Sequence, residues 1–137
     1  MDTTTHMALE VAADRMLEND SVDNIDLVMK EITQIVLQDE EVLIDGTQLE
    51  DGSVDPQHLL VETDYRYYFH VYTSKEHFEK CGGVHPFVLR LKELMEPIYA
   101  EDTFGGITLN YKKGDPMILI SKEEIYHMLE KSLKDSL

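Results

Sequence analysis

A lone cysteine and three histidines stand close together in the stretch FHVYTSKEHFEKCGGVHP, which spans 69–86. His77 and Cys81 are four residues apart, so on a helix their side chains would share one face and the imidazole could reach the thiol. Cysteine catalysis needs such a base together with a lowered thiol pKa. The pair therefore defines one chemical hypothesis, an enzyme with a cysteine nucleophile.

The surrounding sequence argues against that chemistry. Gly82-Gly83 is typical of a helix end, which places Cys81 at a helix C-terminus, where the dipole raises a thiol pKa. Glu76, Glu79 and Lys80 provide no net positive field. We therefore interpret Cys81 as a small side chain in the last turn of a helix, and we rank the His77–Cys81 enzyme last.

The sequence does not predict a metal or cofactor site. His70, His77, Cys81 and His85 lack the spacings of a zinc site. Neither Asp45-Gly46 nor the following Asp-Gly pair fits a calcium-binding loop, and no phosphate-binding loop or other catalytic signature is present. We predict no catalytic residues, no metal and no cofactor.

The aromatic run at 66–72 provides a different candidate site. It alternates as a strand, which puts Tyr68, His70 and Tyr72 on one face. If that face is exposed, its rings and the following Thr73 and Ser74 form a protein-contact surface, because tyrosine combines contact area with a polar group. If it is buried, the tyrosines reflect ordinary strand composition.

Charge is the strongest compositional signal. The 137 residues include 28 Asp and Glu against 12 Lys and Arg, for a net charge of −16. The excess lies in residues 1–57, and such a chain repels nucleic acid and anionic membranes. One interpretation is an acidic surface that meets a basic partner, and the other is a solvated surface. A single cysteine, no apolar run of about 20 residues and no secretory leader predict a cytoplasmic protein.

The pattern of elements predicts one α+β domain over 1–137. Residues 1–40 form an acidic helical segment, with helices at 3–17 and 22–38. Residues 41–137 form a mixed sheet of about five to six short strands with helices packed on it. Asp45-Gly46 predicts a turn. Two capping boxes, Thr73-Ser74-Lys75-Glu76 and Ser121-Lys122-Glu123-Glu124, predict helix starts after strands.

The order of motifs resembles the SseB-like family (enhanced serine sensitivity protein B, N-terminal domain). Two segments carry the resemblance: 68–78 reads YFHVYTSKEHF, and 106–110 reads GITLN before the strand MILIS and a final helix. It covers roughly 59–130, and Tyr111 stands where the family usually has proline. The resemblance implies a small bacterial cytoplasmic α+β domain and carries over no catalytic residue.

Three functional hypotheses follow. The first is a non-enzymatic binding or regulatory domain of SseB-like type, whose partner is another protein. The second is an acidic inhibitor or immunity protein, in which the 1–57 half covers a basic partner. The third and last is the enzyme that would use Cys81 with His77. Oligomeric state is left open by the sequence.

Overall fold

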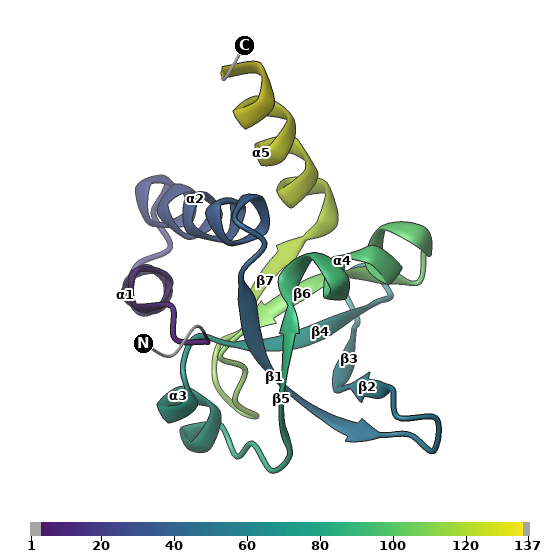
Figure 1. Ribbon diagram of the computed structural model, residues 1–137. Coiled ribbons are helices and arrows are strands. Elements are labelled where there is room, and N and C mark those ends of the chain that lie inside the picture. Colours follow the sequence, from purple (N-terminus) through teal and green to yellow (C-terminus); the bar gives the residue numbers. More distant parts are fainter. Residues whose placement is uncertain (1–3, 136–137) are drawn as a thin grey trace.

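The structure is a computed structural model that describes residues 4–135, and it confirms the α+β class with N-terminal helices ahead of the strands (Figure 1). The helices are α1 (Met7–Glu18), α2 (Val22–Leu37), α3 (Lys75–Lys80), α4 (Leu91–Ala100) and α5 (Lys122–Asp135). The strands are β1 (Glu41–Gln48), β2 (Val54–Pro56), β3 (His58–Val61), β4 (Arg66–Tyr72), β5 (Pro86–Arg90), β6 (Phe104–Leu109) and β7 (Ile118–Ser121).

The seven strands form one mixed sheet. Its central order is β2-β1-β4-β6-β7, and β4 and β6 are parallel while the other pairs are antiparallel. β6 pairs along one edge of β4. The other edge of β4 is shared, because β3 pairs with the first half of β4 and β1 pairs with the C-terminal end of β4. β5 pairs with β1 on the edge of β1 that faces away from β4.

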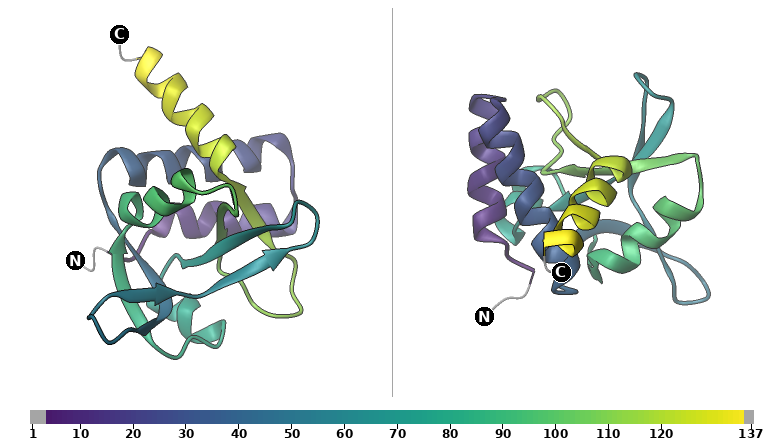
Figure 2. Two further views of the ribbon diagram at one scale, coloured as in Figure 1. Left: turned by 90° about the vertical axis from the view of Figure 1, so that its right-hand side faces the viewer. Right: turned by 90° about the horizontal axis from the view of Figure 1, so that it is seen from above.

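One face of the sheet, the core face, is covered by α1, α2, α4 and α5 (Figure 2). The buried side chains here are aliphatic and include Ile32 from α2, Ile44 from β1 and Ile107 from β6. The opposite face, the lower face, carries a second small cluster of Leu43 and Tyr72 under α3. The C-terminal part of α5 projects away from the rest of the molecule (Figures 1 and 2).

Side chains at helix starts explain where several helices begin. Ser21 caps α2, and Ser121 and Glu124 form the predicted capping box at α5, with each side chain bonded to the backbone N–H of the other. At α3 the observed N-cap lies one residue after the predicted one. The N-cap is Ser74, which accepts from His77 N at 3.1 Å, so the expected Thr73 cap is wrong.

The turn predicted at Asp45-Gly46 is also wrong. Both residues lie inside β1, because β5 and β2 extend the pairing of β1 through these positions. At Gly46, a Cβ would come within 2.9 Å of Asp55 O, so glycine is needed for the close approach of β2. Among residues 4–135, no helix is long and apolar enough to cross a membrane.

Candidate functional site

The strand predicted as a contact surface is buried on both faces from Tyr68 to Tyr72. Tyr68, His70 and Tyr72 are 3%, 5% and 3% exposed, and Thr73 and Ser74 are buried as well. Of the two alternatives, the exposed contact surface of Tyr68, His70, Tyr72, Thr73 and Ser74 is therefore wrong, and the buried face is confirmed. The alternation of the strand is right, but Phe78 of α3 packs edge-on against Tyr72, and the ring of Tyr111 covers His70.

His70 is held as a neutral side chain. Its Nδ1 lies 2.7 Å from Thr108 Oγ1, and its ring stacks on Tyr111 at a centroid distance of 4.4 Å. Burial lowers the pKa of His70 to about 4; His58 also lowers it, while Asp45 opposes the shift. The His70 imidazole is thus a packed side chain of the strand and does not become protonated near neutral pH.

A polar cluster lies where the carboxyl ends of the parallel strands β4 and β6 meet, a position where α/β sheets often bind ligands. We call Glu10, Thr73, Ser74, His77 and Asn110 the strand-end cluster. Glu10 Oε1 accepts from Ser74 Oγ at 2.7 Å and from Thr73 Oγ1 at 3.1 Å, and it contacts His77 Nδ1 at 2.5 Å. Asn110 Oδ1 accepts from Thr73 N at 2.9 Å. Together these contacts tie α1 to β4, α3 and the end of β6.

Electrostatics in the cluster favour an ionised carboxylate. Burial raises the pKa of Glu10, but the hydrogen bonds from Ser74 and Thr73 and the charge of His77 lower it below its ordinary value overall. Glu10 therefore acts as a fixed acceptor that anchors α1.

Although the cluster contains serine, histidine and glutamate, it is not arranged for nucleophilic catalysis. A catalytic histidine binds the hydroxyl through one ring nitrogen and the acid through the other. Here the same Nδ1 of His77 faces both Glu10 and Ser74, and the Ser74 hydroxyl donates to Glu10 while accepting from the α3 backbone. The arrangement is that of a helix cap fastened to a neighbouring helix.

The structure does not join His77 to Cys81. His77 is turned toward α1, where Nε2 lies 3.7 Å from Asp14 Oδ1, and Cys81 Sγ instead donates to Asn110 O at 3.4 Å. Cys81 is the C-cap of α3, as predicted. Burial raises the pKa of its thiol above the ordinary value, despite the nearby Lys112. Among the described residues, no group of three or more His, Cys, Asp or Glu could hold a metal ion.

A groove of about 510 Å³ opens on the lower face between α3 and β5. Its floor is continuous with the small apolar cluster under α3, because it includes Leu43 and Phe78. Val84, Pro86 and Val88 form the β5 side, and Val84 and Val88 remain 67% and 45% exposed. The groove, unlike the buried face of β4, presents apolar atoms to solvent.

The groove is built by specific long-range contacts. Asp45 is 3% exposed and accepts from the backbone N–H groups of Val84 at 3.1 Å and His85 at 3.0 Å, which fixes the loop between α3 and β5. Gly83 lies against the Phe78 ring, where a Cβ would come within 2.5 Å. The loop is therefore held in place before any partner binds.

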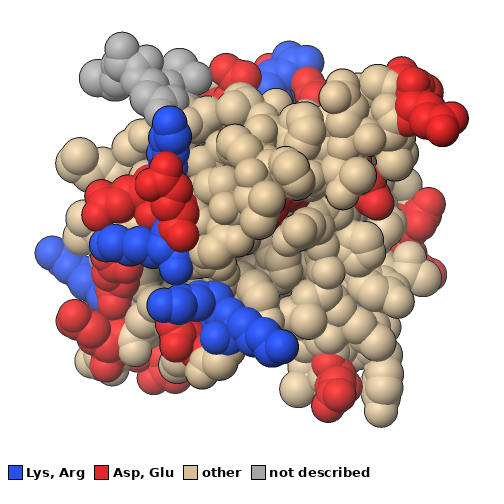
Figure 3. Space-filling model, turned by 90° about the horizontal axis from the view of Figure 1, so that it is seen from below, with Lys and Arg blue, Asp and Glu red and all other residues tan. Residues whose placement is uncertain are grey.

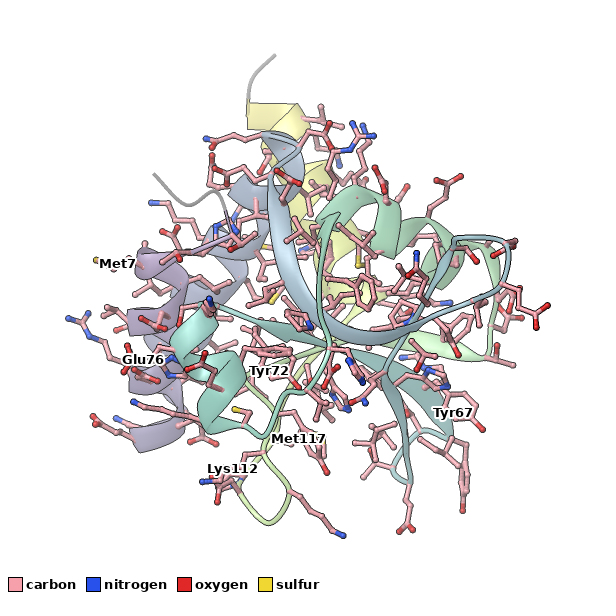
Figure 4. All side chains as sticks on the ribbon, turned by 60° about the horizontal axis from the view of Figure 1, so that its bottom comes forward. Met7, Tyr67, Tyr72, Glu76, Lys112 and Met117 are labelled. Carbon is pink, nitrogen blue, oxygen red and sulfur yellow. The ribbon has the colours of Figure 1, made fainter. Side chains whose placement is uncertain are left out.

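The β1 and β5 sides of the groove are apolar, whereas α3 contributes Lys75 and Glu79 to its lining. Leu43 is opposite both Tyr72 and Val88 in the sheet, so all three face the lower side. Figure 4 brings this side forward and shows Tyr72 between α3, marked by Glu76, and the loop marked by Lys112 and Met117. In Figure 3 the middle of the same face shows few charged atoms, and most charges gather along one border.

No family model, curated protein or solved structure matches the chain. The SseB-like resemblance therefore stays a prediction from the quoted motifs.

Sequence reasoning missed Glu10, Asp45, Val84 and Val88 as residues that build a site. Glu10 meets residues more than 60 positions away, so no local pattern indicates it. Asp45 did carry a signal, because an acid directly after the apolar run Val42–Ile44 is typical either of a turn or of a buried carboxylate with fixed donors.

Proposed function

We propose that the chain is a non-enzymatic cytoplasmic binding domain of SseB-like type, and that it holds another protein in the groove between α3 and β5. The residues with catalytic potential are engaged elsewhere: His77 with Glu10, Cys81 at a helix end with a raised thiol pKa, and His70 under Tyr111. This engagement leaves binding as the activity that the described surface supports best.

The observation that carries the proposal is a preformed groove with an apolar floor and an apolar β5 side, on a highly charged chain. Two exposed valines, Val84 and Val88, border a floor that is already packed, in a chain of net charge −16. Contiguous apolar surface costs solubility and marks interaction sites, whereas single exposed apolar residues need no explanation. A partner that covers Val84 and Val88 gains apolar burial without first reorganising the groove.

A pair of matched variants tests the proposal. Val84→Gln fills the groove wall with a neutral polar side chain, and Val22→Gln makes the same change on α2, where Val22 is similarly exposed at 73%. Tagged proteins are incubated with lysate of the organism that encodes the chain, and captured proteins are quantified by mass spectrometry. We expect one captured protein to be retained by wild type and by the Val22 variant and lost from the Val84 variant. Equal capture by all three would contradict binding in the groove.

The acidic-inhibitor hypothesis is the second candidate, and one observation favours it. Glu18, Asp20, Asp23 and Asp26 are exposed around the α1–α2 connection and form no ion pair with any described residue. Unpaired like charges on one surface attract a basic protein at a rate that salt suppresses. This surface is separate from the groove.

Neutralising substitutions distinguish the two binding surfaces. Asp20→Asn with Asp23→Asn removes two acidic charges near the α1–α2 connection, and Glu62→Gln with Glu96→Gln removes two elsewhere. The inhibitor hypothesis predicts that only the first pair slows association with a captured basic partner and flattens its salt dependence. Equal effects of the two pairs would show that net charge alone acts, which contradicts a specific acidic interface.

A further inference from the structure

Strand β5 has an open edge. Among the described residues, β5 pairs only with β1, from Glu41↔Arg90 to Asp45↔Pro86. Antiparallel strands bond through every second residue pair. The bonds Leu91 N→Glu40 O and Gly46 N→His85 O at the two ends set this alternation, so the odd-numbered residues of β5 bond to β1.

The even-numbered residues of β5 therefore direct their backbone polar groups away from the sheet. Pro86 provides a C=O, Val88 an N–H and a C=O, and Arg90 an N–H. Pro86 has no N–H, and Arg90 is the N-cap of α4, so its C=O belongs to the helix. The edge thus offers acceptor, donor, acceptor and donor in sequence, which is what an added strand bonds to.

The side chains of two of these residues, Pro86 and Val88, face the groove. Val88 is opposite Leu43 across the β1–β5 pair, and Pro86 and Val88 line the groove, while Phe87 and Leu89 pack toward the core face. A strand laid along β5 would therefore place every second side chain beside Val88 and Pro86 on the lower face. Backbone pairing and apolar contact are available to one extended segment at the same time.

The net charge of the chain indicates which kind of segment would pair with β5. The chain carries −16, and Arg90 at the end of β5 is already paired with Asp39 at 3.0 Å and Glu93 at 2.6 Å, which offsets its positive charge. A second copy of this acidic chain would be repelled, whereas a basic segment is attracted.

We propose that β5 accepts an extended, basic segment of a partner protein as an eighth strand, with alternate apolar side chains packed beside Val88 at the margin of the groove. The inference rests on the proposed function, because it specifies how the groove binds. It assigns the specificity to a pattern of alternating apolar and basic residues in the partner.

The test uses a capped heptapeptide of alternating lysine and valine as the probe, with the full chain labelled for NMR. We expect the Val88 and Arg90 amides to exchange rapidly with solvent in the free protein and to slow at least about tenfold when the peptide is bound, since exchange requires an open hydrogen bond. The Phe87 and Leu89 amides, already bonded to β1, should change little. Two control peptides carry N-methyl groups on alternate backbone nitrogens, either on those that would donate to β5 or on those that face away from it. The first control peptide cannot donate to β5 and should not bind.

A matched pair of variants checks the edge itself. Val88→Pro removes an outward N–H, which an edge position tolerates, and Val88→Thr keeps the N–H and the shape of the side chain. We expect the proline variant to bind the peptide about three- to tenfold more weakly, as for one lost hydrogen bond, and the threonine variant to bind more tightly than the proline variant. Thermal unfolding of both variants confirms that each one folds.

Each contrary outcome is distinct. No slowing of exchange at Val88 and Arg90 with millimolar peptide would overturn strand addition, as would protection confined to α1 and α2. Sedimentation at twice the chain mass, reversed by Val88→Pro, would identify a second copy as the occupant and also overturn the proposal. Loss of lysate capture in Val84→Gln alongside any of these results would leave groove binding standing, so the two proposals fail separately.

Discussion

His70 allows a quantitative test of the buried lower face of β4. Burial lowers its pKa to about 4, against 6.5 for an ordinary histidine. Because the folded pKa lies below the unfolded one, the unfolded chain binds the proton first as pH falls. The stability associated with neutral His70 is therefore complete above pH 6.5 and is lost progressively toward pH 4.

The expected magnitude follows from the two pKa values. Between about pH 7 and about pH 5, linkage through His70 alone removes about 2 kcal/mol of unfolding free energy. We choose His70→Gln as the perturbation, because its amide can still bond to Thr108 Oγ1 but cannot take up a proton in this range. The variant loses some stability at every pH through poorer packing on Tyr111, but that loss does not vary with pH.

The assay is urea unfolding of both proteins across this range, with the difference in unfolding free energy plotted against pH. We expect the advantage of wild type over His70→Gln to shrink by about 2 kcal/mol between about pH 7 and about pH 5. NMR titration of the His70 ring should show no protonation above about pH 5. A difference that does not depend on pH, or a His70 that titrates near 6.5, would refute the burial of this face.

Three further predictions concern Cys81 at the end of α3, the strand-end cluster and the groove. Cys81 should react with iodoacetamide at neutral pH more slowly than free cysteine, since burial raises its thiol pKa; a faster rate would revive the thiol enzyme. Ser74→Ala should cost about 1 kcal/mol in urea unfolding through loss of the α3 cap and of the bond to Glu10, and an unchanged midpoint would contradict this role. Asp45→Ala should cost about 2 kcal/mol and also weaken partner capture, because two loop amides lose their acceptor and the Val84 wall is released. Full partner capture by this variant would show that the loop holds its position without Asp45.

The elements that could be predicted are those with local causes. The period of apolar residues gives α2, the serine and glutamate of the 121–124 box give the start of α5, and Gly82-Gly83 gives the end of α3. Each of these signals lies within a few residues of the feature that it specifies. The mixed sheet followed from alternating strands with helices between them.

The features that could not be predicted have causes far away in the chain. The local sequence around Asp45 predicts a turn, but Asp45 continues β1 because β2 and β5 pair with β1 on its two edges. The backbone donors to the Asp45 carboxylate come from a loop about 40 residues away. Alternation in 66–72 predicts two faces but not that α3 and Tyr111 cover the second one. The groove beside β5 has no sequence signature, because α3, β1 and β5 each contribute part of it.

Photo-crosslinking in the cells that encode the chain tests groove binding most directly. A benzophenone amino acid is placed at Val84, on the groove wall, or at Val22, which is similarly exposed on α2. We predict one discrete crosslinked protein from position 84, absent from position 22, whose crosslinked peptide is an extended segment with alternating apolar and basic residues. Identical crosslinks from both positions, or none from position 84, would contradict the assignment of the groove as the binding site.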